Sequence, residues 1–107
     1  MDNYKTMDDI SEELIIIPKA TMDLLLKQTN PGDLIALCTF YYYIAKCQQT
    51  NKPKANNNYC MKGLGWGKDK FSKAKSKLKE LKLIQDVTAR NETTYKITGH
   101  YIHVTFI

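Results

Sequence analysis

Apolar residues are unevenly spaced along the chain, and their spacing predicts four helices and a small sheet. Residues 1–13 are polar and acidic without any period, so we expect a flexible acidic tail. The run Leu14–Ile17 is rich in β-branched residues and is stopped by Pro18, a combination typical of an edge strand. Over Thr21–Gln28 the apolar residues share one face, which predicts a short helix.

The longest helical pattern begins at Asn30 and runs to about Gln48. Asn30 is suited to accept a backbone N–H as the helix cap, Pro31 fits the first turn, and Asp33 favours the positive end of the helix. Two apolar stripes run along it, and a helix that is apolar nearly all round is either the centre of its domain or covered by a second surface. We expect the first stripe to be core. The first stripe consists of Leu34, Leu37, Cys38, Tyr41, Ile44 and Ala45, and the second of Ala36, Phe40, Tyr43 and Cys47.

Two shorter helices follow a polar connector at Thr50–Asn58. The first is expected over Tyr59–Gly63, with Asn57 or Asn58 as its cap. A glycine-rich turn, Gly63–Gly67, then leads into a helix over Lys68–Leu81. The apolar seam of this last helix is formed by Phe71, Ala74, Leu78 and Leu81.

The C-terminal part has the pattern of a β-hairpin. Strands are predicted over Leu83–Ala89 and Tyr95–Thr98, with a turn at Arg90-Asn91-Glu92 and a bulge or kink at Gly99. The final strand, Tyr101–Ile107, alternates, with Ile102, Val104 and Phe106 on one face.

Two helices joined by a tight glycine turn and followed by a hairpin are the elements of a winged helix-turn-helix. Gly65 supplies the turn, Leu64 the apolar residue before it, and Phe71 the apolar residue in the first turn of the second helix. We therefore predict an α+β winged helix-turn-helix, with about four helices and a small antiparallel sheet, as a single domain over residues 14–107.

Charge is distributed unevenly along the 107 residues. The formal net charge is +5, but residues 1–33 contain seven acidic and three basic side chains, whereas residues 34–107 contain four acidic and thirteen basic ones. Seven of these bases are lysines within Lys68–Lys82. Cations gathered on one element are typical of a nucleic-acid binder, and the alternative is a solvated lysine face that keeps a small protein soluble. The first interpretation requires seven ammonium groups that point outward from one exposed helix.

A recognition helix directs its N-terminal residues at base edges and its flanks at the phosphates of the groove walls. Because lysine is a point charge without the fork of arginine, we expect phosphate contacts to outnumber base contacts. Five neutralised phosphates would give log K a slope of about −4.5 against log salt. The expected groove-facing residues are Lys68, Asp69, Ser72 and Lys73. The predicted DNA-contacting set also includes Lys70, Ser76, Lys77 and Lys79, and Arg90 at the hairpin tip, for which simple solvent exposure is the alternative.

Three stretches of the chain resemble a known group of proteins. They are Leu64-Gly65-Trp66-Gly67-Lys68-Asp69-Lys70-Phe71, Leu78-Lys79-Glu80-Leu81-Lys82-Leu83-Ile84 and Gly99-His100-Tyr101-Ile102-His103-Val104. These are similar to winged-helix domains near the N-terminus of phage and plasmid replication initiators and related helix-turn-helix proteins. The likeness covers about residues 14–107. It implies DNA binding in the replication of phages or mobile elements, or in transcriptional control. Lys82 stands where that group more often has glycine, so we expect a less sharply terminated helix.

A second hypothesis from a different class is a protein-interaction module that uses the same scaffold without touching DNA. Its contact surface, with a second copy or with a replication protein, would be the second stripe of the long helix, formed by Ala36, Phe40, Tyr43 and Cys47.

Catalytic and metal-binding motifs are not evident. Gly63–Lys68 lacks the spacing of a phosphate-binding loop, and no Cys pair has zinc-ligand spacing. We expect no enzyme activity, no cofactor and no metal. Three cysteines at unrelated spacings and the lack of a long apolar run lead us to expect reduced thiols in a cytoplasm and no membrane contact. The resemblance implies that this is the cytoplasm of a bacterium or of a phage-infected cell.

Overall fold

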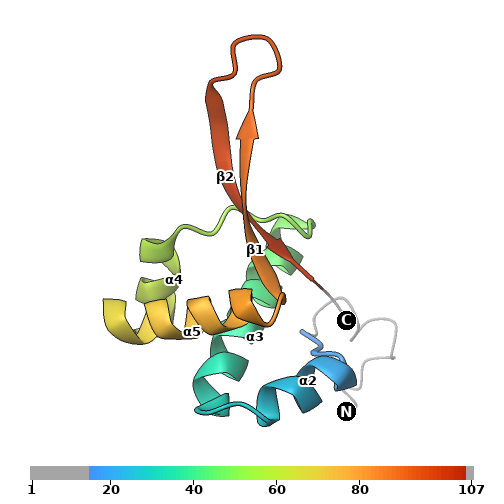
Figure 1. Cartoon of the computed structure of the whole chain (residues 1–107), viewed down its shortest axis with the longest axis vertical. Helices are drawn as coiled ribbons and strands as arrows, with labels where there is room; N and C mark the ends of the chain where they lie inside the picture. Colours follow the sequence, from blue (N-terminus) through green and yellow to red (C-terminus); the bar gives the residue numbers. More distant parts are fainter. Residues whose placement is uncertain (1–14, 106–107) are drawn as a thin grey trace, which may run out of the picture.

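The computed structural model describes residues 15–105, over which the protein is α+β with four helices and one two-stranded antiparallel sheet (Figure 1). The predicted fold class is confirmed, since this arrangement is compatible with a winged-helix-like fold. The predicted acidic tail, residues 1–13, lies outside the described residues. The elements are α2 (Lys19–Leu26), α3 (Pro31–Gln48), α4 (Asn57–Leu64), α5 (Lys68–Glu80), β1 (Ile84–Arg90) and β2 (Ile97–Val104).

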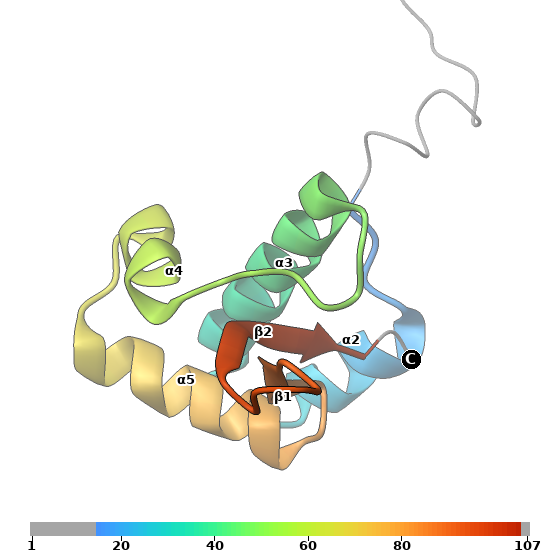
Figure 2. The ribbon, with the colours of Figure 1, turned by 90° about the horizontal axis from the view of Figure 1, so that it is seen from above.

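Helix α3 is the central element of the domain. It contacts α2, α4, α5 and β2, and the whole of its predicted first stripe is buried. Viewed along the hairpin, α5 borders one side of the hairpin, whereas α3 and α4 lie on the other side (Figure 2). The core is completed from α5 and the hairpin. The buried residues contributed by these elements are Phe71, Ala74, Leu78, Leu83, Ile84, Ile102 and Val104.

The helix caps differ in detail from the sequence-based prediction. Asn30 does stand at the N-cap of α3, but its backbone is left-handed (φ 55°) and its side chain makes no cap hydrogen bond. Pro31 occupies the first turn as predicted. The cap of α4 is Asn56, whose side chain accepts the N–H of Tyr59 at 2.8 Å, so the expectation of Asn57 or Asn58 is wrong by one residue.

The prediction of a strand at Leu14–Ile17 is wrong for residues 15–17, the part of this run that the structure describes. They precede α2 without strand pairing, and the sheet contains only β1 and β2. A β-branched run becomes a strand only when another backbone edge pairs with it. Helix α2 also begins two residues earlier than predicted, directly after Pro18, and ends at Leu26 rather than Gln28.

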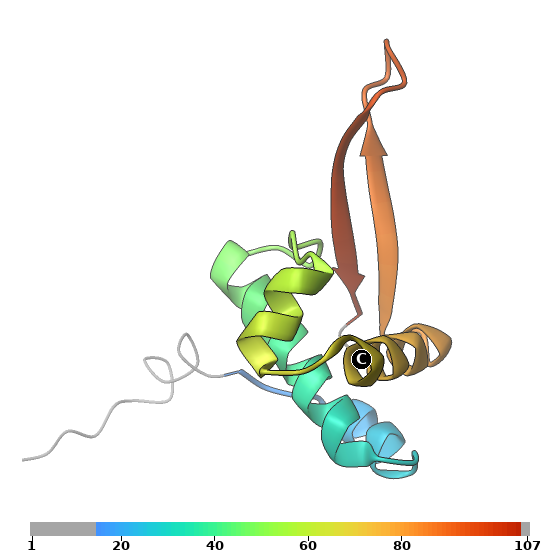
Figure 3. The same cartoon turned by 90° about the vertical axis from the view of Figure 1, so that its left-hand side faces the viewer.

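The hairpin is simpler than predicted, because β2 is one strand from Ile97 to Val104 instead of two strands separated by a kink at Gly99. The register passes from Ala89↔Gly99 to Arg90↔Ile97, which leaves Thr98 as an extra residue in β2. The irregularity therefore lies beside Gly99, one residue from its predicted position. The base of the hairpin is buried in the core, and the distal part projects away from the helices (Figure 3).

Candidate nucleic-acid interface

The turn between α4 and α5 is built on Gly65, as the sequence predicts. Gly65 has φ 69°, and its N–H donates to the Lys62 carbonyl at 3.3 Å. The Trp66 N–H donates to the Met61 carbonyl at 3.0 Å, which completes the two-bond pattern of a left-handed helix end. Residues with a side chain are strained in this left-handed conformation, whereas glycine adopts it without strain. Gly65 therefore allows the turn that sets the direction of α5.

Gly63 lies against the Phe40 ring where α4 meets α3. A Cβ at position 63 would lie 2.5 Å from Cζ of Phe40, so a larger residue there would require the phenyl ring to move. The helix-turn-helix is thereby positioned by two glycines with different roles, one for the turn and one for the close helix contact.

Helix α5 buries the narrow seam predicted for it. Phe71, Ala74 and Leu78 are buried, and Leu81, which caps the helix, is partly buried. The opposite side of the helix faces solvent, including all four predicted groove-facing residues. The exposed residues on this outer face are Lys68, Asp69, Ser72, Lys73 and Ser76.

The expectation of seven outward-pointing lysines is met only in part: five of them are exposed, whereas Lys75 and Lys77 are partly buried. Lys75 has only 14% of its side chain exposed and pairs with Asp86 at 3.3 Å. Lys79 pairs with the same carboxylate at 2.7 Å. Among the described residues, Lys68, Lys73 and Lys82 form no ion pair, whereas the other four lysines of the segment share three carboxylates.

The other flank of α5 is also partly neutralised. The ammonium of Lys70 lies 3.5 Å from Asp33 and 4.9 Å from the centre of the Trp66 ring. Lys77 pairs with Glu80 at 3.6 Å within the helix. Trp66 therefore packs beside the turn with a cation over its face.

Asp86 belongs to this region, although the sequence pattern does not single it out. Burial opposes its ionisation, but the hydrogen bond from Lys79 and the charge of Lys75 outweigh that effect and lower the pKa of Asp86 below its usual value. The carboxylate is therefore ionised at neutral pH. The only sequence signal is its spacing of seven residues from Lys79, which spans the end of a helix and the start of a strand.

The hairpin tip holds Arg90 in an exposed position, but not without contacts. Its guanidinium donates to the carbonyl oxygen of Tyr95 at 3.3 Å. The side chain of Asn91 accepts the N–H groups of Thr93 and Thr94 and so organises the turn. Tyr95, with 74% of its surface exposed, projects at the same tip and was not singled out from the sequence.

The second stripe of α3 divides into two parts. Ala36 and Phe40 are partly buried, whereas Tyr43 and Cys47 are exposed. The Phe40 ring lies 6.0 Å from that of Tyr43 and 6.1 Å from that of Tyr59 on α4. These three rings form an aromatic patch across α3 and α4.

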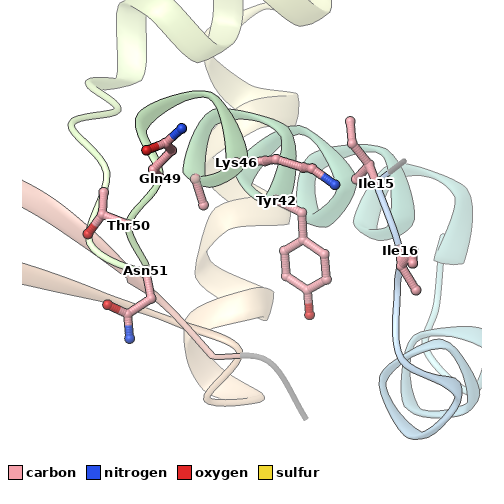
Figure 4. Close-up of a pocket in the computed structure, with 8 residues that line it drawn as sticks. Ile15, Ile16, Tyr42, Lys46, Gln49, Thr50 and Asn51 are labelled. Atoms are coloured by element: carbon pink, nitrogen blue, oxygen red, sulfur yellow. The ribbon is translucent and has the colours of Figure 1, made fainter. Parts of the chain in front are cut away.

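A separate pocket of about 540 Å³ lies between the residues before α2 and the end of α3 (Figure 4). Ile15 and Ile16 line one side, and the ring of Tyr42 projects from α3 into the same region. It contains none of the predicted DNA-contacting residues.

Two of the thiols are poorly suited to nucleophilic chemistry. Burial raises the pKa of Cys38 and of Cys60 to about 11, so little thiolate is present at neutral pH. Over residues 15–105, no three His, Cys, Asp or Glu side chains gather as a metal site would require. Within the same range, no helix has the length and apolar character needed to cross a membrane.

No family model, curated protein or solved structure matches this chain.

Proposed function

We propose that this domain binds double-stranded DNA, with the outer face of α5 in the major groove and the hairpin along the sugar-phosphate backbone of the DNA. One observation carries the proposal: Lys68 and Lys73 are exposed and free of ion pairs on the helix that follows the glycine turn. Lys68 and Lys73 are suited to contact DNA phosphates, and the exposed polar side chains beside them, such as Ser72 and Asp69, are suited to a small number of base contacts.

The resemblance to phage and plasmid replication initiators supports a role in replication initiation or transcriptional control. The two roles require the same contact between one helix and a duplex, and they differ in what is assembled afterwards. Winged helices serve both uses, so DNA binding is the part of the proposal that the residues of α5 support directly.

The test is fluorescence anisotropy with labelled duplex DNA over a series of salt concentrations. Three lysines without ion pairs release about three counterions, so log K is expected to fall with log salt at a slope near −2.7. This is shallower than the slope expected from the sequence alone, because four lysines of the segment already have acidic partners.

The decisive variant is Lys68→Glu combined with Lys73→Glu, expected to weaken binding by about 100-fold or more without changing the circular dichroism spectrum. The matched control is Lys19→Glu with Lys27→Glu, which makes the same change in net charge at the two ends of α2. Equal losses in both variants, or binding that is insensitive to salt, would show that α5 is not the interface.

A second candidate function is protein association through the aromatic patch. The observation that favours it is the exposure of Tyr43 (45%) and Tyr59 (54%) beside Phe40, together with exposed Cys47. A second copy or a replication protein would cover these rings. Sedimentation equilibrium tests self-association: a dimer that is lost in Tyr43→Ser supports it, and a monomer at high concentration counts against a second copy as partner.

A further inference from the structure

The carboxylate of Asp86 lies where α5 meets the hairpin. Asp86 follows Ile84 by two residues, so both side chains project from the same face of the hairpin. Ile84 is buried in the core, whereas Asp86 emerges at the edge of α5 with half of its side chain exposed. There its two oxygens lie 3.3 Å from the ammonium of Lys75 and 2.7 Å from that of Lys79.

The lysines held in this way belong to the hairpin-facing flank of α5. At about 100° per residue, Lys75 and Lys79 lie about 40° apart around the helix, and Lys68 lies between them in projection, where this flank borders the outer face. Lys68 has no ion pair among the described residues, whereas Lys75 also donates a hydrogen bond to the Asn57 side chain at 2.8 Å. A DNA backbone that follows the junction of α5 and the hairpin would pass this flank, and its phosphate oxygens would compete with Asp86.

We propose that Asp86 occupies the place of a DNA phosphate between Lys75 and Lys79, so that it lowers the affinity of the domain for duplex DNA. The inference rests on the proposed function and adds a negative element to the same site. A DNA phosphate must displace the Asp86 carboxylate from two lysine ammonium groups. The contacts on this flank therefore add their full binding energy only when the DNA backbone fits the junction of α5 and the hairpin. Binding to duplexes of arbitrary sequence is mostly electrostatic, and Asp86 thereby weakens this nonspecific binding.

The experiment compares Asp86→Asn with the unmodified protein by anisotropy on one duplex over a salt series. Two released lysines are expected to make the salt slope steeper by about 1.8 and to tighten binding by about five- to tenfold at 0.1 M salt. The matched control is Asp23→Asn on α2. It removes an equally exposed carboxylate (50% against 51%) from an ion pair with Lys19 of 2.8 Å, and it should change the affinity by less than about twofold.

A double-mutant cycle distinguishes competition for the lysines from a purely structural role. Lys79→Gln should weaken binding by no more than about twofold in the unmodified protein, but by about fivefold in the Asp86→Asn background. Hydrogen exchange of the hairpin amides, measured on the same proteins, reports whether the hairpin keeps its structure.

Each outcome decides the matter. Tighter binding with a steeper slope supports the inference, as does duplex binding that is detectable only after Asp86→Asn. Unchanged binding in Asp86→Asn overturns it while DNA binding stands. Weaker binding with faster hairpin exchange also overturns it, because Asp86 then braces the hairpin. If neither protein binds any duplex, both the inference and the proposed function fail.

Discussion

Helices α3 and α5 are the two longest of the described helices and have opposite roles. Of the 18 residues of α3, seven are buried, and they face more than one neighbouring element. Of the 13 residues of α5, only three are buried, along one seam. Stability and binding are therefore separable in this domain. Truncation of buried side chains in α3 should destabilise the protein, whereas side-chain changes on the outer face of α5 that preserve the helical backbone should alter ligand binding alone.

The largest expected effect comes from truncation of the α3 core by Leu37→Ala. Leu37 is fully buried, and the lost contacts and the cavity together should lower the free energy of unfolding by about 3 kcal/mol. Urea denaturation followed by circular dichroism measures the loss. The comparison variant is Ser76→Ala on the outer face of α5, expected to change stability by less than about 0.5 kcal/mol. Similar losses in both would contradict the contrast between the two helices.

The end of α5 offers a stabilising change of about 0.5–1 kcal/mol through Lys82→Gly. Lys82 has φ 63°, its N–H donates to the Lys79 carbonyl, and the Leu83 N–H donates to the Leu78 carbonyl at 3.0 Å. The helix is therefore sharply terminated, and the expectation of a less sharply terminated helix is wrong, because Lys82 adopts the left-handed conformation at a cost in strain.

The same substitution inside α5 provides the control for Lys82→Gly. Lys73→Gly should lower the melting temperature, because glycine in a helix interior costs about 1 kcal/mol. Opposite signs at the two positions identify the left-handed backbone as the cause, and a loss of stability in Lys82→Gly would show that the backbone there is not strained.

A smaller effect is expected at the centre of α3 from Tyr41→Phe. The Tyr41 hydroxyl is buried without a hydrogen-bond partner among the described residues, and burial raises the pKa of Tyr41 well above its usual value. Removing this hydroxyl should leave the free energy of unfolding unchanged or raise it by up to about 1 kcal/mol.

The neighbouring tyrosine is the matched control in chemical denaturation. The Tyr42 hydroxyl donates to the Thr105 carbonyl at 3.3 Å, so Tyr42→Phe should cost about 0.5–1.5 kcal/mol. A larger loss for Tyr41→Phe than for Tyr42→Phe would reveal a hydrogen bond at Tyr41.

The smallest effect is the pH dependence that Asp86 contributes. Its pKa is lower in the folded protein than in the unfolded chain, so its contribution is present above the unfolded value and is lost as the pH falls through the folded one. Since half of the side chain is exposed, the contribution is a few tenths of a kcal/mol. The stability difference between the unmodified protein and Asp86→Asn should shrink from about pH 5 downward. A constant difference from pH 7 to pH 2 would mean that no such ion pair exists.

The local pattern of apolar and turn residues was sufficient to predict most of the helices and the hairpin. The first stripe of α3 could be predicted because residues three and four apart must share a helix face, wherever the helix lies. The turn at Gly65 could be predicted because one backbone conformation favours one residue type. The strand at Leu14–Ile17 could not be judged in this way, since pairing depends on a partner edge supplied by another part of the chain.

The same distinction between local pattern and contacts between elements applies to the candidate site. Helical period and backbone conformation are local properties, so the residues alone were enough to predict a lysine-rich helix that follows a glycine turn and buries a narrow seam. Which of those lysines are free to bind a ligand depends instead on contacts between elements. Ion pairs such as Lys79–Asp86 and Lys70–Asp33 join different elements, and Coulomb attraction acts over distances in space that spacing along the chain does not specify.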